Sequence, residues 1–495
     1  MLVSGSRLAK NTMWNVLGQG LPLLVGFVAI PFLIHGLGTD RFGILTISWM
    51  VIGYFSIFDF GLGRALTKLT AEKLGTGMKK EIPELVWTAL LMMGVLGIVG
   101  GLVVAGISHW LVYGVLNVPG ELRGETLRAF YLLALSIPLV IGTTGLRGIL
   151  EAYQRFGLVN AVRIPLGLWT FLGPLVALEF SNSLYPVVGV LVAGRFFALI
   201  IHFCLCIYVV PTLRNGVVIK RHLILPLASF GGWMTISNII GPIMVYMDRF
   251  FIGAIISIAA VAYYTTPYEV VTKLWLIPMA LVSVLFPAFS STFVNNKVAT
   301  AKLFDRGTKY IFVVMFPLML VIMTFAYEGL ELWLGKEFAI NGFKILQWLT
   351  IGVFINSLAR VPFVLIQGVG RPDIIATIHL LELPLYLILL WWFLNTYGIE
   401  GAAAAWTIRI IIDFLIFNLV SAKLLIESKQ FIRENAVSVF IALLSLVVPI
   451  IIPDVLTKTV YLFVILLIYS LLAWKLLLGD KERNFIKGFV RVKYL

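Results

Sequence analysis

Fourteen apolar runs, each long enough to cross a lipid bilayer as one α-helix, dominate the chain. A helix rises about 1.5 Å per residue, so about 20 residues cross the roughly 30 Å of hydrocarbon. The predicted spans are 12–34, 43–66, 85–108, 129–148, 157–179, 187–210, 223–250, 261–289, 309–328, 346–366, 373–394, 402–422, 436–452 and 459–478. Only short connections remain between them. The pattern predicts an all-α polytopic membrane protein.

Composition supports the membrane interpretation. Of the residues, 60% are hydrophobic and 13% are charged, and the mean hydropathy is +1.01. A soluble domain carries about 25% charged residues, so most of this surface must face something other than water. Prolines such as Pro138, Pro165 and Pro384 interrupt the runs. Kinks of this kind are tolerated where neighbouring helices satisfy the freed backbone groups, and they predict bent helices around a cavity.

The distribution of positive charge predicts the orientation. The net charge is +14, which could indicate nucleic-acid binding, but basic residues also concentrate in cytoplasmic loops of membrane proteins. With the N-terminus in the cytoplasm, 26 Lys and Arg fall on the inner side and 6 on the outer side. This ratio predicts that both termini are cytoplasmic and that no nucleic acid is bound.

Several classes of protein are disfavoured by what the sequence lacks. The longest predicted outer loop, 109–128, is too short for a folded catalytic domain. No GxxxxGK[ST] phosphate loop occurs, so we expect no ATP hydrolysis and assign no catalytic residue. Two cysteines, Cys204 and Cys206, and five scattered histidines predict neither a disulfide framework nor a metal site. The first run is long enough to span, so no cleavable signal peptide is expected.

An internal repeat predicts the domain organisation. Trp14 and Trp233 lie 219 residues apart, Arg155 and Arg371 lie 216 apart, and Tyr185 and Tyr397 lie 212 apart, each pair in a similar local sequence. An offset of six spans is even, so both halves would enter the membrane in the same direction, as in parallel transporter repeats. The expected parts are a six-helix lobe (1–210), a cytoplasmic linker (211–222), a second six-helix lobe (223–425), an extra helix pair (436–478) and a basic tail (479–495).

Ionisable residues inside the predicted spans need an explanation, because each costs at least about 2.5 kcal/mol in hydrocarbon. Some have simple ones. Glu269 and Lys273 are four residues apart and share a helix face, and Arg409 and Asp413 repeat that spacing. Two neighbours, Asp248 and Arg249, lie near the outer end of a span and could reach the interface by snorkelling. Asp59 could bond to backbone or to Arg64.

Four others, Arg163, Arg195, Arg360 and Glu382, have no opposite charge three or four residues away. They must face a watery cavity, a partner on another helix or a ligand, and a buried interhelical salt bridge remains open for each. Guanidinium groups bind phosphate and carboxylate in a bidentate manner. Burial favours the neutral form of a carboxyl, which suits Glu382 to proton exchange. His379 shares its helix face, which predicts a local hydrogen bond with Glu382 and leaves a proton relay as the alternative.

We therefore predict two sets of site residues. The candidates for binding an anionic headgroup are Arg163, Arg195, Arg360, Arg409, Arg249 and Lys273. The candidates for ion coupling or gating are Glu382, Asp59, Asp413, Asp248 and Glu269. We expect no bound cofactor, and coupling to a proton or sodium gradient.

The sequence also carries loose motifs of a known family. They are Ser6-Arg7-Leu8-Ala9-Lys10-Asn11-Thr12, Ile30-Pro31-Phe32-Leu33-Ile34, Gly36-Leu37-Gly38-Thr39-Asp40-Arg41-Phe42-Gly43, Phe58-Asp59-Phe60-Gly61-Leu62-Gly63-Arg64 and Gly370-Arg371-Pro372. With the layout of six, six and two spans, the chain resembles the polysaccharide transporter (Wzx-type O-antigen flippase) family over essentially its whole length. The wider superfamily also holds multidrug and toxic-compound extruders and lipid II flippases.

The resemblance implies two six-helix lobes around a central cavity that opens alternately to each side of the membrane. It implies a substrate of undecaprenyl-diphosphate-linked oligosaccharide, moved from the cytoplasmic to the outer leaflet of the bacterial inner membrane. Polysaccharide polymerase and chain-length proteins would be its partners. The basic intramembrane residues agree with a diphosphate or acidic sugars.

Two other functions compete. A multidrug or cation antiporter of the same architecture predicts an acid-dominated cavity, which the excess of intramembrane arginine disfavours. A membrane glycan polymerase or glycosyltransferase needs a large external loop with carboxylates, and none is predicted here.

Overall fold

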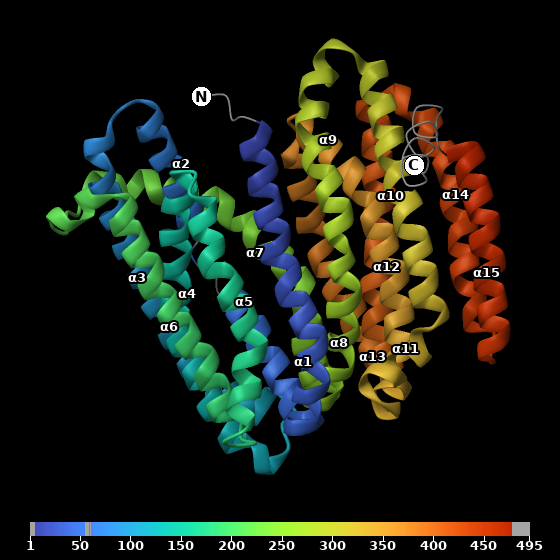
Figure 1. Cartoon of the computed structure of the whole chain (residues 1–495), viewed down its shortest axis with the longest axis horizontal. Coiled ribbons are helices and arrows are strands. Elements are labelled where there is room, and N and C mark those ends of the chain that lie inside the picture. Colours follow the sequence, from blue (N-terminus) through green and yellow to red (C-terminus); the bar gives the residue numbers. More distant parts are fainter. Residues whose placement is uncertain (1–4, 55–58, 60, 478–495) are drawn as a thin grey trace, which may run out of the picture. The chain divides into compact units, whose positions relative to one another are not determined.

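The computed structural model describes residues 5–54, 59 and 61–477, and all the regular structure in this part of the chain is helical (Figure 1). The helices are α1 (Gly5–Tyr54), α2 (Leu62–Gly75), α3 (Ile82–Trp110), α4 (Arg123–Ala152), α5 (Phe156–Leu178), α6 (Leu184–Val209), α7 (Ile224–Ile255), α8 (Ile258–Thr272), α9 (Leu276–Asn295), α10 (Lys297–Thr324), α11 (Ala326–Leu334), α12 (Lys336–Gly368), α13 (Pro372–Leu424), α14 (Lys429–Val447) and α15 (Val455–Leu472). A short 3₁₀ turn, η7 (Lys273–Trp275), joins α8 to α9.

Ten helices of the described residues are long and apolar enough to cross a membrane. One of them, α13, has 53 residues and would be about 80 Å long if straight. It is interrupted at Gly398, where φ is 62° and ψ is −147°. Glu382 and Arg409 would be about 40 Å apart in a straight helix, yet their side chains form an ion pair at 3.4 Å. The chain therefore doubles back, and α13 contains both spans predicted at 373–394 and 402–422.

A second doubling occurs in α1. Gly38 interrupts this helix with φ 74° and ψ 163°. A Cβ on Gly26 would meet the ring of Phe171, and Trp49 stacks edge-on against the same ring at 5.2 Å. Gly26 and Trp49 therefore both contact α5, although a straight helix would separate them by about 35 Å. Counting two spans in each of α1 and α13 gives twelve among the described residues, which is roughly consistent with the prediction of about fourteen.

The second predicted span, 43–66, was extended too far. Helix α1 ends at Tyr54, and α2 begins at Leu62 as a separate helix. Gly61 adopts a left-handed conformation with φ 72°, which a helix does not accommodate. After Arg64, the next charged residue on α2 is Lys68. The apolar run therefore continues into α2, and apolarity alone did not mark the turn before it.

The chain divides into two compact units, Met1–Thr265 and Thr266–Leu495. In the first unit α7 packs against α2 and α3, although we expected residue 223 to open the second lobe. The contact boundary thus falls later than the predicted linker, and the lobe limits remain a prediction. The tail 479–495 lies outside the described residues.

The outer faces of the helices are apolar. On α3, Leu91, Val95, Ile98 and Leu102 are all exposed and recur at helical spacing. Such a stripe is unstable in water but suits lipid.

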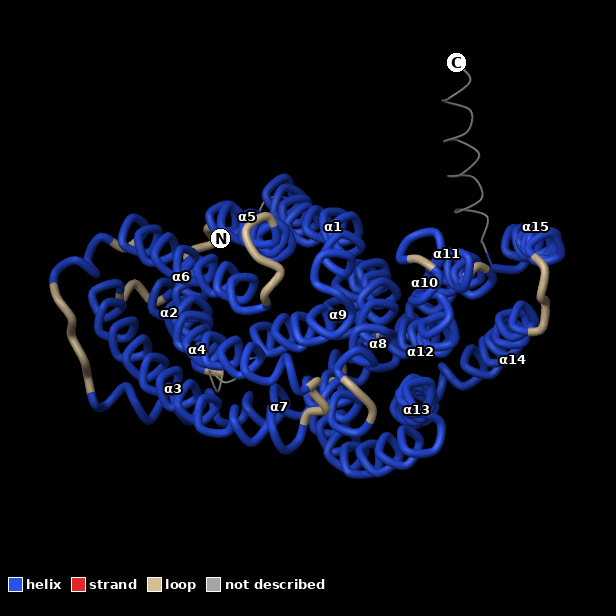
Figure 2. The backbone as a smooth tube through the Cα atoms, turned by 90° about the horizontal axis from the view of Figure 1, so that it is seen from below, coloured by secondary structure: helices blue, strands red, loops and turns tan. Residues whose placement is uncertain are grey.

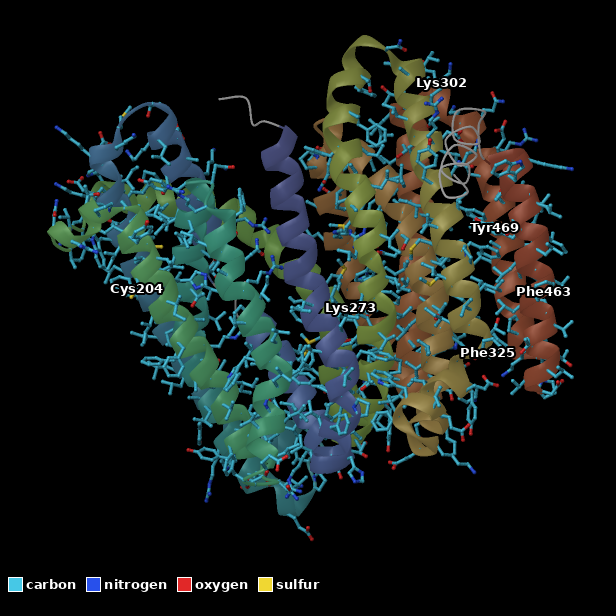
Figure 3. All side chains as sticks on the ribbon, in the orientation of Figure 1. Cys204, Lys273, Lys302, Phe325, Phe463 and Tyr469 are labelled. Carbon is cyan, nitrogen blue, oxygen red and sulfur yellow. The ribbon has the colours of Figure 1, made fainter. Side chains whose placement is uncertain are left out.

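The extra helix pair, α14 and α15, forms a hairpin in the second unit (Figure 2). Figure 3 shows Phe463 on α15, where it is 70% exposed. On the same helix the hydroxyl of Tyr469 donates to the carbonyl of Val313 on α10 at 3.0 Å. Lys458 pairs with Glu328 of α11 at 2.7 Å. One side of the hairpin is therefore fastened to the unit, and the other is suited to lipid.

Candidate functional site

The turn at Gly398 brings four predicted site residues of the second unit together. Arg409 Nε lies 3.4 Å from Glu382 Oε1, across the two halves of α13. Arg409 Nη2 lies 3.9 Å from Asp413 Oδ2, one helical turn further on. All three side chains are buried, with at most 9% exposure. The open question about Glu382 is answered by a buried interhelical salt bridge.

The fourth residue, Arg360 of α12, interacts electrostatically with Arg409 and Asp413. Its guanidinium lies over the ring of Trp275, 5.5 Å from the centroid, and Arg409 lies over Tyr386 at 5.2 Å. The buried Nε of Arg360 has no hydrogen-bond partner among the described residues. We call Arg360, Glu382, Arg409 and Asp413 the α13 charge cluster. With both carboxylates ionised, its two positive and two negative charges cancel.

His379, Glu382 and Asp413 also come close enough to be considered as metal ligands. One ligand atom from each lies within 4.8 Å of the other two. However, Arg409 pairs with both carboxylates, and its positive charge opposes a metal cation at the same place. His379 instead packs against the rings of Phe363 and Phe417. The arrangement favours a charge-paired cluster over a metal centre.

The arginines of the first unit have a different environment. Arg195 on α6 is half-buried and Arg163 on α5 is exposed. Neither has a carboxylate within 4.0 Å among the described residues, although Arg163 interacts electrostatically with Glu151. Arg195 and Arg409 occupy matching spans of the predicted repeat. The repeat positions therefore differ chemically, because the acidic partners that neutralise Arg409 have no counterpart for Arg195. Arg195 and Arg163 are the stronger candidates for binding an anion directly.

Asp248 and Arg249 on α7 do not snorkel, and that prediction was wrong. Their side chains are 0% and 1% exposed, and they pair at 3.9 Å. The hydroxyl of Tyr264 on α8 donates to Asp248 Oδ2 at 2.6 Å, and Arg249 lies over the ring of Tyr246 at 5.0 Å. The buried pair is stabilised by polar partners within the first unit, so it has no need to reach the interface.

Glu269 and Lys273 form the predicted pair. Lys273 Nζ lies 2.8 Å from Glu269 Oε2, and both side chains are partly exposed, at 45% and 37%. Figure 3 shows Lys273 at the junction of α8 and α9. The pairing satisfies both charges locally, as the i, i+4 spacing suggested.

Asp59 binds backbone, as the first of its two interpretations proposed. Its carboxylate accepts hydrogen bonds from the amide of Gly61 at 2.9 Å and from that of Gly63 at 3.1 Å. These amides begin α2, whose first N–H groups have no partner inside the helix. Asp59 therefore caps α2 from a turn that follows the membrane span.

The Asp59 carboxyl predicts a pH dependence of stability. Burial raises its pKa, opposed by the two amide hydrogen bonds and by Arg64 and Arg147. A carboxyl whose pKa is higher in the folded than in the unfolded state contributes stability. This contribution is fully present below the unfolded pKa of about 3.9, and it is lost as pH rises through the folded pKa. We expect the melting temperature of wild type minus that of Asp59→Asn to fall between pH 4 and 7, measured by thermal unfolding of the purified chain.

Asp454 is the matched control for this prediction. It caps α15 through a 2.8 Å hydrogen bond from the amide of Thr457, which lowers its pKa. Its contribution is present above the unfolded pKa and is lost as pH falls through the folded pKa. The corresponding difference for Asp454→Asn should therefore rise or stay level over the same interval. A rise for Asp59→Asn as well would contradict the assignment.

Sequence reasoning missed the aromatic partners of the charges. Tyr264, Trp275 and Tyr386 contact Asp248, Arg360 and Arg409 respectively. Aromatic residues are frequent in apolar spans, and the contacts join residues that are distant in sequence. The one local signal was Tyr386, which lies four residues after Glu382 on the same helix face.

Comparisons with known proteins show which family the chain matches. The family model described as "Polysaccharide biosynthesis protein" matches residues 8–293. A "Putative O-antigen transporter" of Shigella flexneri is 35% identical over 424 residues, which cover 83% of this chain and 96% of that protein.

Solved structures agree on the fold. An inward-facing multidrug resistance MATE family transporter of the MOP superfamily superposes with a TM-score of 0.70, at 14% identity, over 83% of this chain and 98% of the other. The lipid II flippase MurJ, in an inward closed conformation, gives a TM-score of 0.66 at 14% identity, over 94% and 99%. At this identity the likeness establishes the fold alone.

Proposed function

Because the chain belongs to the polysaccharide biosynthesis protein family, we propose that it is a flippase for a lipid-linked oligosaccharide. The observation that carries the proposal is the 35% identity to an O-antigen transporter over 96% of that protein's length. The chain is a transporter in this proposal and not an enzyme. It moves an undecaprenyl-diphosphate-linked repeat unit from the cytoplasmic to the outer leaflet by alternating access.

The intramembrane charges support an anionic substrate. Arg195 lies in the middle of a span and Arg163 in the preceding one, both without an ion-pair partner among the described residues. A guanidinium in a bilayer is costly unless water or an anion meets it. A diphosphate supplies an anion that matches the planar donors of arginine. The lipid tail would stay in the bilayer while the headgroup crosses.

We further propose the bacterial inner membrane as the location, with both termini in the cytoplasm. The 26 to 6 distribution of Lys and Arg supports this orientation. A polysaccharide polymerase and chain-length proteins are the proposed partners, because they would act on the flipped unit. Coupling to a proton or sodium gradient is the proposed energy source. The charge cluster favours the proton, since Arg409 opposes a metal cation there.

A multidrug antiporter is the second candidate, and the observation that favours it is the MATE fold. Its expected acid-dominated cavity is not matched by the described ionisable groups, which include unneutralised arginines. Resistance to cationic drugs on expression, without any effect on surface glycan, would favour this candidate over the flippase.

Complementation tests the flippase directly. A bacterial strain that lacks its own O-unit flippase should regain surface polysaccharide when it carries this chain together with the matching glycan biosynthesis enzymes. Accumulation of lipid-linked repeat units on the cytoplasmic side, without surface glycan, would refute the proposal.

Replacing Arg195 by alanine should lower the flipping rate about tenfold or more, because a hydrogen bond to a charged group contributes about 1.5–3 kcal/mol. Arg195→Lys should retain part of the rate, since it keeps the charge but not the bidentate donors. Arg214→Ala, at an exposed position outside the spans, is the control. Unchanged flipping after alanine replacement of Arg163, Arg195 and Arg360, each in turn, would refute the anion-binding role.

A further inference from the structure

The α13 charge cluster can bind a further ion only if its internal charge balance changes. Its two arginines and two carboxylates cancel when all are ionised, so at that point the cluster has little attraction for a further ion of either sign. Arg409 Nε lies 3.4 Å from Glu382 Oε1, and its Nη2 lies 3.9 Å from Asp413 Oδ2. An anion could recruit Arg409 only by displacing these carboxylates.

We propose that a proton and the anionic headgroup bind to the α13 charge cluster together, because protonation of Glu382 releases Arg409 for the anion. The inference rests on the proposed function, which supplies a diphosphate as the anion. It specifies the sign of the coupling: proton uptake strengthens anion binding, and the two do not compete.

The proton and the anion would bind to different atoms of the cluster. The proton occupies a carboxyl oxygen, whereas the anion binds guanidinium groups, so each occupies atoms that the other does not use. Arg360 Nε is already a buried donor with no hydrogen-bond partner among the described residues. Once Glu382 is neutral, the cluster has a net charge of +1, and Arg409 loses its ion pair with Glu382. Two neighbouring guanidiniums then meet an anion with only Asp413 opposing it.

The closeness of the Glu382 and Asp413 carboxyl groups favours proton uptake by the cluster. Glu382 and Asp413 both lie beside Arg409 and bring oxygens within 4.8 Å of each other. Two carboxylates at such a distance in a low-dielectric interior favour sharing a proton. A proton needs no coordination shell, so it can occupy a carboxyl oxygen of this buried cluster.

Other titratable and charged groups also face the cluster. His379 and Tyr386 come from the first half of α13, Arg360 from α12, and Tyr268 from α8, where it interacts electrostatically with Arg360. His379 is the one competing proton acceptor near neutral pH. It packs against the rings of Phe363 and Phe417, whereas Arg409 pairs with the two carboxylates. Its protonation would add charge without releasing Arg409.

The linkage is reciprocal in its thermodynamics. If protonation strengthens anion binding by a given factor, then bound anion strengthens proton binding by the same factor. Couplings between sites of this kind are typically about 5- to 150-fold. We expect the lower half of that range, about tenfold, because Asp413 stays beside Arg409.

Binding of undecaprenyl diphosphate to the purified full chain in lipid nanodiscs tests this linkage. Glu382→Gln keeps the shape of the side chain and imitates its protonated form. At pH 8 this variant should bind undecaprenyl diphosphate about tenfold more tightly than wild type. As pH falls to 6, wild type should approach the variant. Comparing the two proteins at each pH cancels any titration of the diphosphate itself.

Two controls isolate charge and position. Undecaprenol, which has the same tail without the diphosphate, should bind both proteins equally. Glu400→Gln neutralises another paired carboxylate of α13, which lies 3.1 Å from Lys344 but is 42% exposed, and it should bind like wild type. Arg409→Gln in the Glu382→Gln background should abolish the gain in affinity.

Equal or weaker binding by Glu382→Gln would overturn the proposal, provided that the variant elutes as a single species in gel filtration. So would a pH dependence that persists in full in this variant, which would assign the effect to His379. Complementation separates this outcome from failure of the proposed function. Restored surface glycan without the linkage rejects only the linkage, whereas linkage without restored glycan rejects only the flippase.

Discussion

Replacing Arg409 by alanine should destabilise the second unit by about 3–5 kcal/mol, the cost of leaving buried charges without their partner. Arg409 is 7% exposed, and both Glu382 and Asp413 depend on it. Its removal leaves two adjacent carboxylates in an apolar interior. The effect is measured as the loss of unfolding free energy, or of melting temperature, of the purified chain in detergent.

Matched variants show whether charge is the cause. Lys344→Ala breaks a pair with Glu400 in which the side chains are 53% and 42% exposed, and it should cost under about 1 kcal/mol. The combined replacement Arg360→Met, Arg409→Met, Glu382→Gln and Asp413→Asn removes every charge of the cluster and should recover most of the loss. A single Arg409→Ala variant as stable as wild type would show that the pairing is not a stabilising feature.

Replacing Gly398 by alanine should cost about 1–3 kcal/mol, because φ 62° with ψ −147° is a conformation that side chains resist. The consequence extends beyond local strain. The turn at Gly398 aligns the two halves of α13, and the ion pair between Glu382 and Arg409 depends on that alignment. Flipping should therefore fall together with stability, and both are measurable on the same preparation.

Gly329 supplies the control for this substitution. It lies in α11 with nothing within 4 Å of an added Cβ and with no positive φ. Alanine there should be neutral or should stabilise the helix by up to about 1 kcal/mol. Equal effects of Gly398→Ala and Gly329→Ala would show that the backbone at residue 398 imposes no requirement for glycine.

Local spacing made some of the site predictable. The pairs Glu269–Lys273 and Arg409–Asp413 followed from the helical rise, because residues four apart share a face whatever the tertiary structure. The partnership of Glu382 with Arg409 did not follow. They are 27 residues apart, and only the reversal at Gly398 brings them together.

Depth was less predictable than spacing. Asp248 and Arg249 were placed near the interface from their position in the run, but they are fully buried because Tyr264 and Tyr246 meet them. Asp59 was placed inside a span, but it lies in a turn where it binds the amides of Gly61 and Gly63. In both cases the partners that meet the charge are tyrosine side chains or glycine amides. Neither kind of residue is recognisable in the sequence as the partner of a charge.

The sequence alone determined that this is a polytopic helical membrane protein, because the length of an apolar run and the thickness of a bilayer are set by covalent geometry and hydrocarbon. It also identified most of the ionisable residues that lie within the spans, although Asp59 proved to lie in a turn before α2. Only the tertiary structure decided which of them are neutralised. Arg409 is paired with two carboxylates and Arg195 with none among the described residues, because ion pairing depends on distances of a few ångströms that the folding of the helices sets.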